Sequence, residues 1–168
     1  MDHDFPTPEQ QEKALPLTWN RLAGITTQTA TPSEESMDNV RANIDRPLPW
    51  FHDTFPVKDK PDVSGRSIAL VGGGPSIKDT VRELLDFSTI IACGSAHDWL
   101  QANSPRVPTY CAVCDPDPVM ANYLRAPDRR TKYLISSHCN PTVFDALEGY
   151  DVTMWHCWPI GAGGQEER

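Results

Sequence analysis

The chain has 168 residues, the length of one ordinary domain with a short appendage. Hydrophobic residues make up 39% of it, enough for a core, and no apolar run is long enough to cross a membrane as a helix. Its net charge of −8 disfavours nucleic-acid binding, because phosphate contacts need clustered Lys and Arg. The N-terminus carries no signal-peptide pattern, so we expect a cytoplasmic protein without a membrane span.

Residues 1–62 are predicted to form a proline-rich acidic arm. They hold eight of the 16 prolines and 11 acidic residues against six basic ones. One short helix is expected from Ser33 to about Ile44, because a Thr-Pro-Ser start signal precedes two glutamates in its first turn. The residues that share one face of this helix are Met37, Val40, Arg41 and Ile44.

The arm ends in an aromatic cluster formed by Trp50, Phe51 and Phe55. The favoured interpretation is that the arm packs on the domain that follows it. The alternative is that the cluster is a surface for a protein partner.

Five apolar runs follow the arm at intervals of about 20 residues, with segments of helical spacing between them. The runs cover residues 67–71, 88–93, 109–114, 132–136 and 151–157. Strands that alternate with helices at this spacing predict a parallel sheet. We therefore expect an α/β fold over residues 63–160. It is a Rossmann-like, doubly wound, mostly parallel sheet of about five strands, covered on both faces and followed by a polar tail over residues 161–168.

A glycine-rich loop follows the first strand and is the sharpest local signal. It consists of Gly72, Gly73, Gly74, Pro75 and Ser76. Three glycines let the backbone turn tightly and approach a ligand closely, and Ser76 can cap a helix that begins near Ile77. The loop predicts a binding site for nucleotide phosphates, whereas the alternative is a plain turn between strand and helix.

Two familiar nucleotide-binding patterns do not match this loop. No Lys-Ser or Lys-Thr follows the glycines, which argues against a P-loop ATPase. Ile77 stands where the dinucleotide pattern needs its third glycine, and the second strand ends in Cys93-Gly94-Ser95 without an acid for the ribose. A nicotinamide or flavin enzyme is therefore disfavoured.

Polar residues follow the other strands, at the edge where ligands bind in such sheets. They are Gly94, Ser95, Asp115, Asp117, Ser137, His138 and Asn140. Asp115 and Asp117 are candidate Mg²⁺ ligands, although Asp117 has the alternative role of capping the next helix. Ser137 is a candidate ligand contact. His138 is a candidate acid or base, and the alternative is a loop histidine without such a role.

The five cysteines are expected to be reduced. Cys111 and Cys114 form a CxxC pattern, but residues three apart on a strand point to opposite faces and cannot hold one ion together. We therefore expect buried small residues and no structural zinc.

The segments IALVGGGPSIKDTVREL, IIACGSAHDWLQANSPRVPTYCAVCDPDP and LISSHCNPTVFDAL, within residues 66–158, resemble the MptE-like family, formerly domain of unknown function 115. The family includes a 6-hydroxymethyl-7,8-dihydropterin pyrophosphokinase and flagellin glycosylation factors. Its loop matches residues 72–76 and its Asp-Pro matches Asp115, and the loop is also similar to that of bacterial CMP-sialic acid sialyltransferases. Many members carry Asn where this chain has Gly94-Ser95, and they continue past the fifth strand.

The resemblance implies a nucleotide-binding transferase, a diphosphokinase that moves diphosphate from ATP to a small hydroxylated acceptor. The loop would hold the ATP phosphates and magnesium would bind at Asp115. One alternative is a glycosyltransferase-like enzyme that uses a CMP-sugar and needs no metal. Another is a truncated, non-catalytic module that binds a nucleotide or a protein partner.

Overall fold

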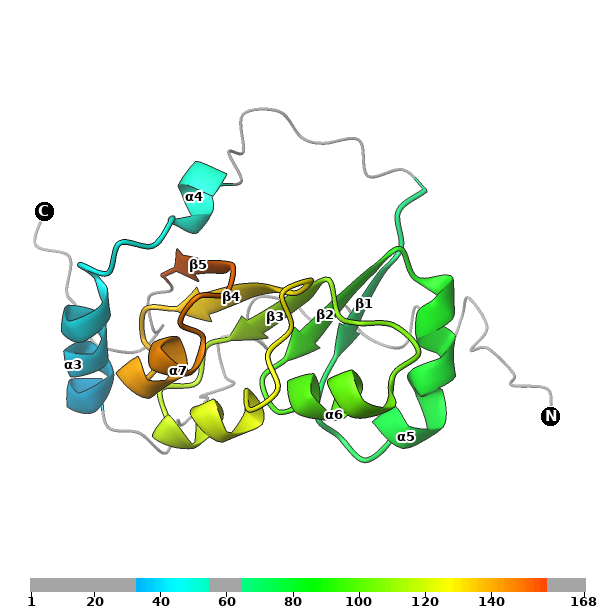
Figure 1. The fold of residues 1–168 in the computed structure, drawn as a ribbon. Helices are drawn as coiled ribbons and strands as arrows, with labels where there is room; N and C mark the ends of the chain where they lie inside the picture. Colours follow the sequence, from blue (N-terminus) through cyan, green and yellow to red (C-terminus); the bar gives the residue numbers. More distant parts are fainter. Residues whose placement is uncertain (1–32, 55–64, 157–168) are drawn as a thin grey trace, which may run out of the picture. The chain divides into compact units, whose positions relative to one another are not determined.

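Five parallel strands form one sheet in the computed structural model, which describes residues 33–54 and 65–156 (Figure 1). The strands are β1 (Ile68–Val71), β2 (Thr89–Cys93), β3 (Tyr110–Val113), β4 (Lys132–Ser136) and β5 (Val152–Trp155). Each pairs in parallel with the next along the chain, in the order β1-β2-β3-β4-β5. The predicted α/β, Rossmann-like sheet of about five parallel strands is confirmed.

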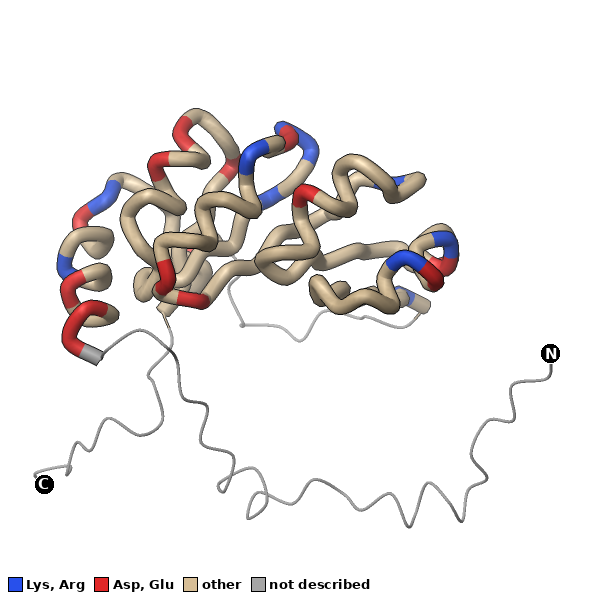
Figure 2. The backbone as a smooth tube through the Cα atoms, turned by 90° about the horizontal axis from the view of Figure 1, so that it is seen from below, with Lys and Arg blue, Asp and Glu red and all other residues tan. Residues whose placement is uncertain are grey.

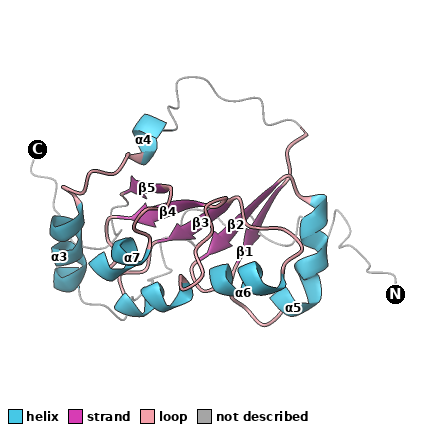
Figure 3. Cartoon of the chain, in the orientation of Figure 1, coloured by secondary structure: helices cyan, strands magenta, loops and turns pink. Residues whose placement is uncertain are grey.

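The segments between the strands form short helices along one face of the sheet (Figure 1 and Figure 3). They are α5 (Ile77–Thr80), the 3₁₀ helix η1 (Val81–Asp86), α6 (Ala96–Asn103), the 3₁₀ helix η2 (Pro118–Tyr123) and α7 (Pro141–Ala146). Right-handed crossovers reach both faces only where the strand order reverses, and this order does not reverse. The crossovers of residues 65–156 therefore cover one face, and the predicted doubly wound arrangement is not found in the described residues. On the second face, Phe51 of α4 lies beside Ala112, Leu134 and Trp155.

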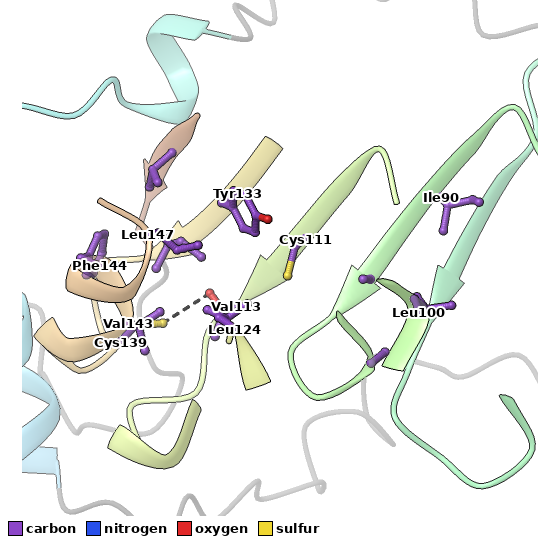
Figure 4. Close-up of a cluster of buried hydrophobic side chains, with 14 of the residues drawn as sticks. Ile90, Leu100, Cys111, Val113, Leu124, Tyr133, Cys139, Val143, Phe144 and Leu147 are labelled. Atoms are coloured by element: carbon purple, nitrogen blue, oxygen red, sulfur yellow. Dashed lines mark hydrogen bonds between the residues drawn. The ribbon is translucent and has the colours of Figure 1, made fainter. Parts of the chain in front are cut away.

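The hydrophobic core lies between the sheet and these helices (Figure 4). Every second strand residue faces it, so that Ile90, Cys111, Tyr133 and Ile135 are fully buried. The helices contribute Leu100, Leu124, Val143 and Leu147. Alternate residues of β2, β3 and β4 are only partly buried, and those of β1 are exposed, with Ile68 58% and Leu70 72% accessible.

Two helices precede the sheet in the chain, α3 (Ser33–Asn43) and α4 (Phe51–Thr54). The extent of α3 confirms the predicted helix. Of the face that the sequence pattern marked, only Val40 is buried, whereas Met37 and Ile44 are 39% and 48% exposed. The exposed side of α3 carries acidic and basic residues, seen as red and blue turns in Figure 2.

Two asparagines take the place of the expected apolar contacts of α3, since Asn39 is 5% and Asn43 0% exposed. Their amides donate hydrogen bonds to backbone carbonyls of the main domain, which makes their burial favourable. A hydrophobic pattern could not reveal this contact.

Within residues 33–54, Trp50 and Phe51 do not form the predicted aromatic cluster. Trp50 packs on the hydrophobic core and bridges to Met154 of β5, whose N–H donates to the carbonyl oxygen of Pro49 at 2.8 Å. Phe51 is 40% exposed, and Phe55 lies outside the described residues. The predicted packing of the arm on the domain is therefore observed at Trp50.

The described residues belong to one compact unit, which runs from Ala30 to Ala162. The predicted boundaries at residues 62 and 160 fall on residues that the structure does not describe. Among the helices of residues 33–54 and 65–156, none is long and apolar enough to cross a membrane.

Candidate functional site

The glycine-rich loop follows β1 at the edge of the sheet, and all of its residues from Gly72 to Ser76 are exposed. The chain then turns into α5, where Ile77 N–H donates to Gly74 O at 3.2 Å. The predicted cap by Ser76 is wrong. Ser76 has helical dihedrals (φ −63°, ψ −17°) and makes no side-chain cap bond, because a capping serine needs an extended backbone.

Gly73 lies directly against the loop that follows β2. A Cβ atom added at Gly73 would stand 2.2 Å from Ser95 Oγ and 3.2 Å from Ser95 Cβ, whereas one added at Gly72 would meet nothing within 4 Å. The loops after β1 and β2 thus form one exposed surface, and glycine at position 73 permits their close approach.

Gly94 has a separate reason to be glycine. Its φ is +44°, and an added Cβ would lie 2.6 Å from Met120 Cε of η2. This turn brings Ser95 to the start of α6, where it stands at the N-cap position without a side-chain cap bond. Ser95 is exposed and Gly94 is buried.

The Asp115-Pro116-Asp117 turn follows β3. Asp115 Oδ1 accepts the Asp117 N–H at 3.0 Å, and Asp117 Oδ1 accepts the Val119 N–H at 2.8 Å. The capping role that the sequence suggested for Asp117 is therefore confirmed. Asp115 is exposed and follows β3, which is separated from β1 by β2.

The carboxylates of Asp115 and Asp117 suit a metal site that a bound ligand completes. No group of three or more His, Cys, Asp or Glu residues within the described ranges is arranged to hold a metal ion. Mg²⁺ is commonly held by one or two carboxylates together with substrate phosphates and water. Asp115 suits that mode, with the ligand completing the site, and Asp117 contributes mainly to the helix cap.

The residues after β4 lie in different surroundings, because Ser137 is 0% and His138 5% exposed. Asn43 Nδ2 donates to Ser137 O at 3.1 Å and to Cys139 O at 2.8 Å. Asn39 Nδ2 donates to His138 O at 3.1 Å and to Pro116 O at 3.3 Å. Helix α3 thus covers the loop after β4 and ties it to the turn after β3.

Two hydroxyl–imidazole pairs stand side by side here. Ser36 Oγ lies 2.8 Å from His138 Nδ1, and Ser137 Oγ lies 2.6 Å from His156 Nδ1. The two rings stack with centroids 5.0 Å apart. His156 is itself exposed, and its partial desolvation, together with the charge of His138, lowers its pKa below the ordinary value.

The candidate residues therefore fall into two groups. The loops after β1, β2 and β3 expose Gly72, Gly73, Gly74, Pro75, Ser76, Ser95 and Asp115. The loop after β4 buries Ser137 and His138 under α3. Sequence reasoning missed Ser36, Asn39, Asn43 and His156. The four-residue spacing of the two asparagines on one helix face was the available signal.

The four cysteines that the structure describes show no arrangement typical of a metal-binding site. Burial raises the pKa of Cys111 to about 12, with smaller contributions from Cys93 and Asp98. Burial also raises the pKa of Cys93. Cys111 is buried and Cys114 exposed, as expected for residues three apart on a strand. Thiols with raised pKa values are poor nucleophiles at neutral pH.

A buried polar network lies at His97, which is 0% exposed. Its Nδ1 lies 2.8 Å from Asp98 Oδ1 and its Nε2 lies 3.2 Å from Tyr133 Oη, which accepts the Asp128 N–H at 2.7 Å. The carboxylate of Asp98 also accepts the Arg125 N–H at 3.0 Å. These bonds join α6 to the segment before β4, so the network holds the fold together.

Comparison of the chain with protein-family models, with curated proteins and with solved structures found no match.

Proposed function

We propose that the loops after β1, β2 and β3 bind the phosphates of a nucleotide, and that the protein is a nucleotide-dependent transferase. The observation that carries this proposal is the contact of Gly73 with Ser95, which joins two strand-end loops into one exposed surface. A glycine-rich turn directly after the first strand of a parallel sheet is a common place for phosphate binding.

The reaction proposed is diphosphate transfer from ATP to a small hydroxylated acceptor. The acceptor oxygen would attack the β-phosphorus, the bond between the α- and β-phosphoryl groups would break, and AMP would leave. Such transfer depends mainly on positioning and on neutralisation of charge. The glycine loop would orient the phosphates, Asp115 would hold magnesium, and the metal would supply positive charge to the phosphate oxygens.

His138 is the proposed acid or base of this reaction. Its Nδ1 lies 2.8 Å from Ser36 Oγ. Because His138 is only 5% exposed, this role requires a ligand group that reaches the buried loop after β4.

The direct test is nucleotide binding by calorimetry, with ATP, CTP and CMP, each with Mg²⁺ and with EDTA. ATP with Mg²⁺ should bind, and Gly73→Ala should weaken binding at least tenfold, because the new methyl group meets Ser95. Gly72→Ala is the matched control, since its methyl group has open space.

Pairing Gly73→Ala with Ser95→Gly removes both clashing atoms and should restore part of the affinity. Binding of CTP or CMP that survives EDTA would favour the glycosyltransferase alternative. Absence of binding by all three nucleotides would contradict both enzyme functions.

A further inference from the structure

The outer edge of β1 has no strand partner among the residues that the structure describes. No segment within residues 33–54 and 65–156 pairs with it, whereas the opposite edge of the sheet, at β5, is bridged by Trp50. The strand reads Ile-Ala-Leu-Val and contains no charge or proline. Natural sheets usually protect their edges with such residues, with bulges or with a covering segment.

The backbone of β1 alternates between its partner strand and the open side. Ser67 O accepts the Thr89 N–H at 3.1 Å, and Ile68 is in register with Thr89. Ser67 and Ala69 therefore direct their backbone groups toward β2. Ile68 and Leu70 direct theirs outward, where an added strand would find two N–H donors and two carbonyl acceptors.

A groove of about 370 Å³ runs along this strand. One wall is β1, and the other is formed by α5 and η1. Its helical wall presents the apolar side chains of Ile77, Val81, Leu84 and Phe87. A strand edge beside an apolar groove is the arrangement that accepts an additional extended segment.

We propose that this edge pairs with β1 of a second copy of the chain, in antiparallel orientation about a two-fold axis. The axis would pass between the two Ala69 residues, so that Ile68 of each copy stands opposite Leu70 of the other. Because Ile68 and Leu70 both direct their backbone groups outward, this register forms four hydrogen bonds.

The same register also places the side chains well. Ile68 and Leu70 lie on the open face of the sheet, 58% and 72% exposed, and each would cover its counterpart across the axis. A two-fold contact needs a self-complementary surface, and an uncharged strand that pairs with itself provides one. This inference is independent of the proposed nucleotide site.

The predicted dimer is weak. A strand of four residues offers less surface than the roughly 800 Å² per partner that stable complexes bury. Association should therefore depend on protein concentration, with a dissociation constant in the micromolar range or above.

Disulfide trapping tests the register. In non-hydrogen-bonded antiparallel pairs the Cα atoms lie about 4.5 Å apart, which a disulfide can span. Ala69→Cys should give a covalent dimer under mild oxidation at least ten times faster than Leu85→Cys. Leu85 is the matched control, because it is 58% exposed on η1 and lies outside the groove.

Sedimentation from about 1 µM to about 1 mM tests the association itself. The mass of the wild-type chain should rise with concentration, and Leu70→Lys should weaken the dimer at least tenfold while Leu85→Lys leaves it unchanged. Leu70→Pro removes only an outward N–H and should act as Leu70→Lys does.

Three results would overturn the proposal. They are a monomer at every concentration, trapping of Ala69→Cys no faster than Leu85→Cys, and a disulfide from position 69 to a cysteine of the same chain.

Discussion

The loops at the carboxyl edge of the sheet differ sharply along its width. The loops after β1 and β2 meet where Gly73 approaches Ser95, and Asp115 after β3 is also exposed. After β4 the loop is buried under α3, with two asparagine amides bonded to its carbonyls. The exposed loops can accept a ligand, and the buried one is shaped by contacts within the chain. The difference teaches that polar residues at the ends of neighbouring strands can lie in opposite surroundings, because a segment from elsewhere in the chain covers some of them and not others.

The largest change in stability is expected for a substitution of Asn43, which fastens the loop after β4 to α3. Asn43→Ala leaves the carbonyls of Ser137 and Cys139 without their amide donor, and should lower the free energy of unfolding by about 2–3 kcal/mol. Urea denaturation measures it. Asn103→Ala is the control, because Asn103 makes one exposed bond to Trp99 O. It should cost less than about 0.5 kcal/mol. Equal losses for the two variants would mean that α3 does not fasten the loop after β4.

A smaller change in stability is expected for a substitution in the turn after β3. Asp117→Ala removes the acceptor for the Val119 N–H and should cost about 1 kcal/mol, the usual worth of a helix cap. Asp117→Asn keeps an acceptor oxygen and should restore most of the loss.

Asp115→Asn provides the complementary change at the same turn. It also keeps an acceptor for the Asp117 N–H and should leave the unfolding transition unchanged, while it weakens nucleotide binding only in the presence of Mg²⁺. If Asp115→Asn reduces affinity equally in EDTA, the role of Asp115 is not metal binding.

The smallest expected effect is a change in how the stability of the fold depends on pH. Because partial desolvation and His138 lower the pKa of His156 in the folded state, the unfolded chain binds the proton more readily. Stability should therefore fall as the pH drops through about 6.5, the ordinary histidine value. His156→Gln should flatten this slope in thermal unfolding between about pH 7.5 and pH 5.5. An unchanged slope in His156→Gln would place the titration elsewhere.

Much of the fold could be predicted from the sequence, because the signals are local. The apolar runs that end at Val71, Cys93 and Ser136 are strands, because short apolar runs bounded by turn residues favour extended backbone. Asp117 was recognised as a cap from the Asp-Pro turn alone. The cap at Ser76 was not correct, because its backbone is already helical.

Part of the candidate site could be predicted from local sequence, and the rest depended on long-range packing. Residue order alone placed the glycine loop, Ser95 and Asp115 beyond the ends of successive strands, since parallel strands end at a common edge. The burial of Ser137 and His138 depended on where α3 packs. That packing rests on Asn39 and Asn43, whose amides find carbonyl partners about 80 to 100 residues away in the chain.

Local patterns were thus sufficient for the five strands, the helix from Ser33 and the exposed loop at Gly72–Ser76. They report which backbone conformation each segment prefers and which side chains avoid water. The side of the sheet that the crossovers cover, the exposure of Ile68 and Leu70 and the covering of His138 came only from long-range packing. Hydrogen bonds and contacts between distant segments decide these features, and no short stretch of sequence contains both partners.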